Sequence, residues 1–111
     1  MEFALAPFGI IGLETALALT LTQLVRPGHI SLEDAVRLLS CGGAQVCNIV
    51  NAGILAPEVP ADVVVFDPNA QWTITPQDFA SKSSNSPFIG QTVYGKVLYT
   101  LCDGNVVYSQ K

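Results

Sequence analysis

At 111 residues, the chain forms one domain at most, or part of one. Its formal net charge is −4, and its five Lys and Arg residues stand singly along the sequence, which argues against the basic stripe that binds nucleic-acid phosphates. Half of the residues are apolar and only 13% are charged, which indicates a surface that other protein covers in part.

The first segment, residues 5–21, reads LAPFGIIGLETALALTL, a loop with proline and glycine that leads into an apolar run. The spacing predicts a helix over residues 13–25, and Pro27-Gly28 ends it. Three of its leucines also alternate as they would in a strand, but the length and the Ala/Leu content favour a helix. The predicted apolar face carries the leucines at positions 13, 17, 21 and 24.

The same apolar run raises the question of a membrane span. Glu14 is the single charge in residues 3–25, and the proline and glycines of the loop precede it. A charge at mid-span is costly in a bilayer, so a buried helix of a protein without a membrane partner fits better. The N-terminus carries Glu2 and no Lys or Arg, which argues against a secretory signal.

A second helix is predicted to begin after Ser31, which suits an N-cap. Glu33 and Asp34 follow in the first turn, where the helix dipole favours negative charge. We expect Gly42-Gly43 to end this helix and a short third helix to begin at Ala44.

The sequence after Gly53 changes to strands and turns. Residues 61–67, ADVVVFD, predict a strand buried on both faces and bounded by Pro60 and Pro68-Asn69. Residues 71–75 predict a second, shorter strand, and Thr75 suits the cap of a single helical turn. A polar loop follows over residues 81–90.

The end of the chain predicts a β-hairpin. Asp103-Gly104 separates the β-rich runs 92–102 and 105–109, and Asp-Gly in that position is a strong hairpin signal. The chain is therefore predicted to be α+β, with helices in residues 1–50 and strands in residues 51–111.

The residues contain no complete catalytic or metal-binding pattern. His29 is the single histidine, and a lone histidine in a loop is more often structural than a ligand. The acids Asp62 and Asp67 are most simply the polar ends of a strand. The three cysteines, at positions 41, 47 and 102, are interpreted as reduced, buried thiols of a cytoplasmic protein. We therefore assign no catalytic residue and no metal ligand.

Four stretches, in this order, resemble the C-terminal quarter of bacterial-type dihydroorotases, which are zinc-dependent amidohydrolases. They are APFGIIGLETAL, SLEDAVRLLS, AGILAPEVPADVVVFDPNAQWTITPQDFASKSSNSPFIG and GKVLYTLCDGNVVY, and together they cover nearly the whole chain. The resemblance implies the last loop and outer helix of a (β/α)8 barrel in residues 1–50. It implies the C-terminal strands of the small β domain in residues 51–111.

The resemblance also implies a role for the loop. Phe8 and Gly9 match the family's Phe-Gly, which lines the substrate pocket and contacts dihydroorotate largely through backbone. A glycine lets the backbone approach a ligand closely and offer an N–H to an anion. The alternative, that Gly9 only permits a turn, stays open.

The family's zinc ligands and its proton-shuttling aspartate lie upstream of the matching region. Zinc is therefore expected in the intact family enzyme, whereas this chain alone is expected to bind none and to be inactive. The expected partner is the remainder of the dihydroorotase polypeptide or another subunit. Two alternatives remain: a non-catalytic dihydroorotase-like partner of aspartate transcarbamoylase, and a small autonomous binding module.

Overall fold

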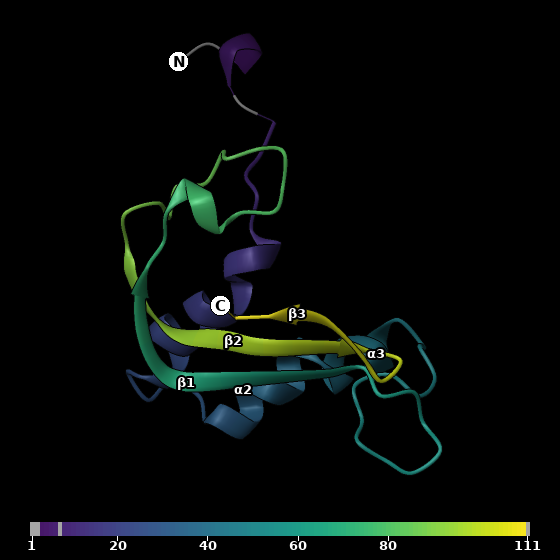
Figure 1. Cartoon of the computed structure of the whole chain (residues 1–111). Helices are drawn as coiled ribbons and strands as arrows, with labels where there is room; N and C mark the ends of the chain where they lie inside the picture. Colours follow the sequence, from purple (N-terminus) through teal and green to yellow (C-terminus); the bar gives the residue numbers. More distant parts are fainter. Residues whose placement is uncertain (1–2, 7, 111) are drawn as a thin grey trace.

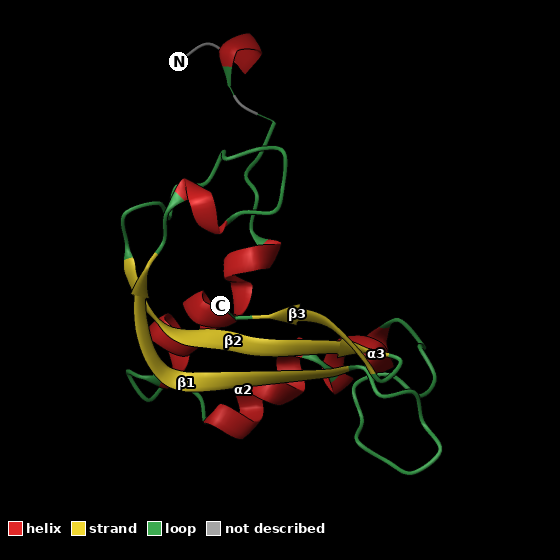
Figure 2. Ribbon diagram, viewed as in Figure 1, coloured by secondary structure: helices red, strands yellow, loops and turns green. Residues whose placement is uncertain are grey.

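The computed structural model describes residues 3–6 and 8–110 and shows helical segments packed on a small antiparallel sheet (Figure 1). The helical segments precede the strands in the chain, apart from one turn between two strands (Figure 2). In chain order the elements are η1 (Phe3–Leu5), η2 (Leu13–Thr15), α1 (Ala16–Thr20), η3 (Leu21–Val25), α2 (Leu32–Leu39), α3 (Cys41–Val46), β1 (Val63–Thr73), η4 (Pro76–Asp78), β2 (Thr92–Cys102) and β3 (Asn105–Ser109).

The predicted helix over residues 13–25 is confirmed; its predicted apolar face is right at Leu21, which is buried, and wrong at Leu13 and Leu24. The turns η2, α1 and η3 follow one another without a break, and η3 is a π-helical turn. Leu13 is 95% exposed and Leu24 is 41% exposed. The buried positions, spaced three apart, are Thr15, Ala18 and Leu21. The helix therefore presents Thr15, Ala18 and Leu21 to the sheet and leaves Leu13 and Leu24 outside.

A glycine on β2 explains this choice of face. Gly95 has φ +104°, and a Cβ placed there would lie 2.5 Å from Cδ1 of Leu21. The missing side chain makes the space that Leu21 fills. Next to it, the Tyr94 N–H donates to Oγ1 of Thr22 at 2.9 Å. The helix is thus fixed to β2 by a leucine seated on a glycine and by a polar contact beside it.

The small core lies between α1 and the far end of the β1–β2 pair. Ala18, Ile74 and Val93 are buried together. Partly buried apolar side chains pack around them: Leu19, Trp72, Phe79 and Phe88. Because Phe79 and Phe88 come from the segment between η4 and β2, this core also holds both ends of the polar loop.

The sheet has the order β1-β2-β3 with antiparallel pairing throughout. The two strands predicted at 61–67 and 71–75 are one long strand, β1, so the boundary at Pro68-Asn69 is wrong. The pairing of β1 with β2 shifts between Asp67 and Gln71 instead. Proline has no N–H to donate to the neighbouring strand. The irregularity in the pairing leaves Pro68 unpaired, and the strand continues beyond it.

The prediction that this strand is buried on both faces is wrong for the chain as it stands. Val64 is 50% exposed and Val65 is 43% exposed. A run of β-branched residues indicates a strand that can be buried on both faces. Such burial also requires a layer of other elements packed on each face of the sheet. The helices supply such a layer on part of the sheet.

The C-terminal hairpin is confirmed. Asp103 and Gly104 have φ values of +49° and +78°, as a type I′ turn requires. The Asp103 N–H donates to Oδ1 of Asp62 at 2.8 Å, and the Gly104 N–H donates to the Ala61 carbonyl at 3.0 Å. The turn is therefore tied to the residues just before β1.

Ser31 is the N-cap of α2, as predicted. The Asp34 N–H donates to Oγ of Ser31 at 3.0 Å. Hydrogen bonds with Ser31 hold the pKa of the Asp34 carboxyl below its ordinary value, with a smaller contribution from Arg37. The cap therefore satisfies a free N–H and favours the charged carboxylate at the helix N-terminus.

The predicted end of α2 at Gly42-Gly43 is wrong. The helix ends at Leu39; its C-cap, Ser40, has φ and ψ of −134° and −93°, and α3 begins at Cys41 with both glycines inside it. A Cβ at Gly42 would lie 2.9 Å from the Arg37 carbonyl oxygen. Gly42 therefore permits the close turn between the two helices, and it does not stop the first one.

Candidate functional site

The loop with the predicted substrate residues leads from the N-terminal segment into η2. The Phe8 side chain is fully exposed. Gly9 has φ +151°, a backbone conformation that side-chain-bearing residues rarely adopt, and a Cβ there would meet nothing within 4 Å. The structure thus places both residues on an open loop, with a backbone that favours glycine at position 9.

Asn85, from the polar loop after η4, holds both sides of this glycine turn. Its side-chain Nδ2 donates to the Gly9 carbonyl oxygen. Its own backbone carbonyl accepts from the Ile11 N–H at 3.0 Å. One residue thus bonds the backbone on either side of Ile10, and the two loops lie side by side above the sheet (Figure 1).

Glu14, in η2 just after the glycine loop, makes a second connection to the segment that follows η4. Its carboxylate accepts from the Ala80 N–H at 2.8 Å through Oε2 and from the Ser81 N–H at 3.2 Å through Oε1. Hydrogen bonds to an ionised carboxylate are stronger than those between neutral groups. The single charge in an otherwise apolar run therefore serves to attach residues 80–81 to the first turn of the helix.

The polar loop is also ordered by its own serines. Oγ of Ser81 accepts from the Ser83 N–H at 3.3 Å, and Oγ of Ser83 accepts from the Asn85 N–H at 3.2 Å. Serine hydroxyls close such short turns by bonding a backbone N–H two residues on. Asn85 is thus presented to the glycine turn by a loop with internal hydrogen bonds.

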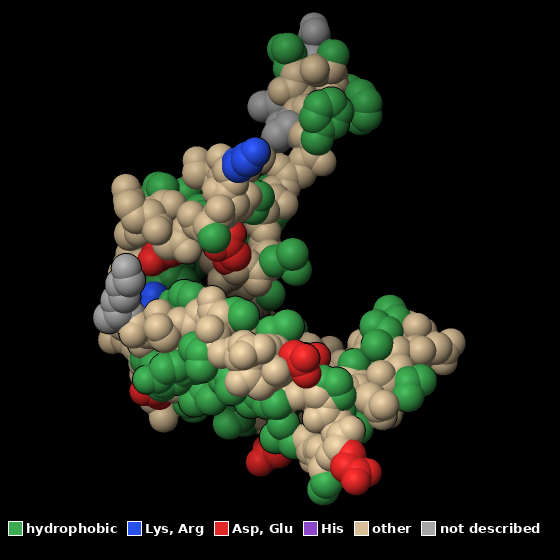
Figure 3. All heavy atoms as spheres, turned by 45° about the vertical axis from the view of Figure 1, so that its right-hand side comes forward, with side chains coloured by type: hydrophobic (Ala, Val, Ile, Leu, Met, Phe, Trp, Pro, Cys, Tyr) green, Lys and Arg blue, Asp and Glu red, His purple; other side chains and the backbone are tan. Residues whose placement is uncertain are grey.

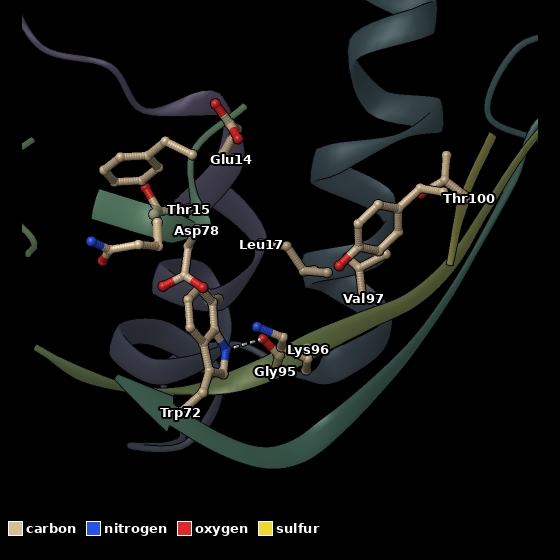
Figure 4. Close-up of a pocket in the computed structure, with 13 residues that line it drawn as sticks. Glu14, Thr15, Leu17, Trp72, Asp78, Gly95, Lys96, Val97 and Thr100 are labelled. Carbon is tan, nitrogen blue, oxygen red and sulfur yellow. Dashed lines mark hydrogen bonds between the residues drawn. The ribbon is translucent and has the colours of Figure 1, made fainter. Parts of the chain in front are cut away.

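A cavity of about 430 Å³ lies between the helix and the sheet (Figure 4). Charged and aromatic side chains meet there: Nζ of Lys96 lies 4.0 Å from the Trp72 ring centroid, and Nε1 of Trp72 donates to the Gly95 carbonyl at 2.8 Å. Glu14 also lines it, whereas Phe8 and Gly9 do not. The cavity and the predicted substrate loop are therefore separate features.

Within residues 3–6 and 8–110, no three His, Cys, Asp or Glu side chains are grouped so that they could hold a metal ion. His29 is exposed. The described residues therefore do not fit a zinc site. All three cysteines are free, and Cys47 and Cys102 are exposed, so the prediction that the thiols are buried is wrong for these two.

The described part of the chain has no helix that combines the length and the apolar character needed to cross a bilayer. The longest continuous helical stretch there runs over residues 13–25, which is shorter than the roughly 20 residues that a span needs.

Comparison with known proteins identifies the family. The sequence pattern of the amidohydrolase family matches residues 9–107. The chain belongs to the amidohydrolase family. Among curated amidohydrolase relatives, it is 45% identical over 108 residues to a dihydroorotase of Clostridioides difficile, covering 97% of this chain and 25% of that protein. It is 48% identical over 103 residues to a dihydroorotase of Streptococcus pyogenes, covering 93% and 24%. The resemblance to dihydroorotases is thereby confirmed.

Solved structures of related amidohydrolases share the fold. A D-hydantoinase superposes with a TM-score of 0.87 at 29% identity, covering 98% of this chain and 24% of the other. The L-hydantoinase of Arthrobacter aurescens superposes with a TM-score of 0.85 at 31% identity, covering 94% and 23%. The chain thus spans about a quarter of the length of the curated relatives and of these structures.

The sequence identified the loop but missed the two residues that hold it. The Asn85 and Glu14 contacts join positions 76, 66 and 67 apart in the chain. Two signals were present: a lone carboxylate in an apolar run, and one amide side chain in a serine-rich loop. Neither signal indicates which backbone group the side chain binds. That pairing depends on how the helix and the segment between η4 and β2 pack together in the fold.

Proposed function

We propose that this chain supplies the C-terminal part of a dihydroorotase, the amidohydrolase that interconverts N-carbamoyl-L-aspartate and dihydroorotate in pyrimidine biosynthesis. The observation that carries the proposal is similarity to dihydroorotases over nearly the whole chain, at 45% identity over 97% of its residues. In this proposal residues 1–50 form the last loop and outer helices of the barrel, and residues 51–111 belong to the small β domain. The order of helical segments and strands supports that division.

Phe8 and Gly9 are the substrate contacts of the proposal. The open space around Gly9 and its glycine-favoured backbone support a close approach of ligand to the main chain. The hydrogen bonds of Asn85 and Glu14 hold this part of the chain in place, which further supports a role of the loop in binding substrate.

Zinc, its ligands and the proton-transferring group belong to the rest of the enzyme in this proposal, since the described residues do not fit a metal site. The partner of this chain is accordingly the remainder of a dihydroorotase, in the same polypeptide or another subunit. A cytoplasmic location is part of the proposal, and the free cysteines of the described chain support it. Association with aspartate transcarbamoylase remains a proposal for a non-catalytic form.

A graft tests the proposal directly. In the C. difficile dihydroorotase, this chain replaces the region that it matches, and the hybrid, here called the grafted enzyme, is purified and its folding and metal content are verified. We expect turnover of dihydroorotate by the grafted enzyme and none by the 111-residue chain alone. A Gly9→Val change in the grafted enzyme is expected to raise KM. Turnover by the isolated chain, or a folded, metal-loaded graft without turnover, would contradict the proposal.

A further inference from the structure

We infer that Asn85 and Glu14 are positioning residues, which hold the Phe8–Gly9 loop in the conformation that receives substrate; this inference rests on the proposed function. Neither side chain needs to touch substrate for this role. Each acts through the backbone that it binds: Asn85 bonds the loop itself, and Glu14, in η2 directly after the loop, bonds the segment between η4 and β2 that carries Asn85.

Asn85 fixes the orientation of the peptide between Gly9 and Ile10. Its Nδ2 holds the Gly9 carbonyl, and its backbone carbonyl holds the Ile11 N–H at 3.0 Å. The Gly9–Ile10 peptide is trans, so its N–H points away from the carbonyl that Asn85 binds. Because Asn85 holds the Gly9 carbonyl on its own side of the loop, the Ile10 N–H of the same peptide points to the opposite side.

The loop needs such anchoring because glycine does not hold one conformation by itself. Gly9 has no Cβ, and a residue of this type has wide backbone freedom. Phe8 beside it is fully exposed, so side-chain packing does not fix the loop there. Ordering a flexible loop when ligand binds costs free energy, and a loop already held in place avoids part of that cost.

Glu14 keeps the anchoring segment itself in place. Both oxygens of its carboxylate are used, one for the Ala80 N–H and one for the Ser81 N–H. Because Glu14 lies in η2, directly after the glycine loop, the carboxylate joins the end of that loop to the start of the serine turns that carry Asn85. The two contacts thus form one closed connection between the loops.

A purely stabilising role and a positioning role predict different kinetics. If the contacts only stabilise the fold, their loss lowers Tm but leaves KM unchanged in the molecules that remain folded. If they position the loop, their loss raises KM for dihydroorotate even at temperatures where the enzyme is fully folded.

The test is Asn85→Ala in the grafted enzyme, with KM and kcat for dihydroorotate measured well below Tm. We expect KM to rise by roughly three- to tenfold, as the loss of one neutral hydrogen bond allows, with a smaller change in kcat. Asn85→Gln keeps an amide donor and is expected to recover part of the affinity. Asn69→Ala is the matched control: Asn69 lies in β1, and its backbone N–H donates to Oδ1 of Asp67, whereas its side chain makes no hydrogen bond within the described residues.

The outcomes separate the inference from the proposed function. An active graft in which Asn85→Ala lowers Tm and leaves KM unchanged overturns the inference and leaves the proposed function standing. An equal rise in KM in Asn69→Ala also overturns it. A folded, metal-loaded graft with the unchanged sequence and no turnover overturns the proposed function, and the inference falls with it.

Discussion

At the scale of single residues, glycines and one capping serine decide how the segments fit together. Leu21 is buried against Gly95, a position where β2 carries no side chain. Gly42 allows the close turn between α2 and α3. Both requirements arise from contacts in the folded structure. The sequence alone does not show whether a glycine ends a helix, permits a positive φ or makes room for a neighbouring side chain.

Replacing Gly95 by Ala is expected to destabilise the chain by about 2 to 5 kcal/mol, the sum of overpacking and backbone strain. The new Cβ would lie 2.5 Å from Cδ1 of Leu21 at a φ of +104°. Gly90→Ala is the matched control, because Gly90 has φ +88° but open space around its Cβ, and about 1 to 2 kcal/mol of strain is expected there. Urea unfolding measures both; equal losses would show that the contact with Leu21 does not matter.

The Ser31 cap makes a prediction about pH. Its hydrogen bonds hold the pKa of Asp34 below the ordinary value of 3.8, so the contribution of this carboxylate to stability is present above that pH and is lost as the pH falls through the lower, folded-state pKa. In Ser31→Ala we expect the pKa of Asp34 to rise toward 3.8, measured by NMR titration of its carboxyl carbon. An unchanged pKa would assign the shift to Arg37 instead.

At the scale of elements, local signals were sufficient wherever local chemistry decides the structure. The helix after Ser31 and the hairpin at Asp103-Gly104 were predicted correctly, because a cap and a two-residue turn depend on neighbours in the sequence. The continuity of β1 through Pro68 was missed, since it depends on pairing with β2. The buried helix face was predicted only in part: Leu21 was named, but the burial of Thr15 and the exposure of Leu13 and Leu24 depend on how the helix lies against Gly95 of β2.

The connection between the two loops is likewise an element-scale feature. Glu14→Gln keeps the shape of the side chain but removes the charge, so its bonds to the backbone are expected to weaken. We expect the amide protons of Ala80 and Ser81 to exchange roughly three- to tenfold faster in this variant, as measured by NMR hydrogen exchange. Glu33→Gln, on the exposed side of α2, is the control and is expected to leave both rates unchanged. Unaltered exchange in Glu14→Gln would show that the carboxylate does not hold this segment.

At the scale of the whole molecule, the chain exposes many apolar side chains. They lie both on the N-terminal segment and over the sheet in the space-filling view (Figure 3). Phe8 and Leu13 belong to the first group, and Val106 and Val107 on β3 belong to the second. A surface of this kind marks contact with other protein, and the low charged fraction of the sequence had indicated it. Under the proposed function, we expect the other parts of a dihydroorotase to cover this surface.

The candidate site was predicted in part. Phe8 and Gly9 were named from a resemblance, and the structure places them on an open loop with a glycine-favoured backbone. Their contact with substrate stays a prediction. The two anchoring residues, Asn85 and Glu14, came from the structure, because hydrogen bonds between loops more than 60 positions apart leave no periodic pattern in a sequence.

The most direct test of the central claim is the rate of dihydroorotate hydrolysis by the grafted enzyme, measured beside the parent C. difficile dihydroorotase at matched metal content. If this chain supplies the C-terminal part of such an enzyme, the folded hybrid turns over dihydroorotate. A hybrid that is folded and metal-loaded but leaves dihydroorotate intact would contradict the account.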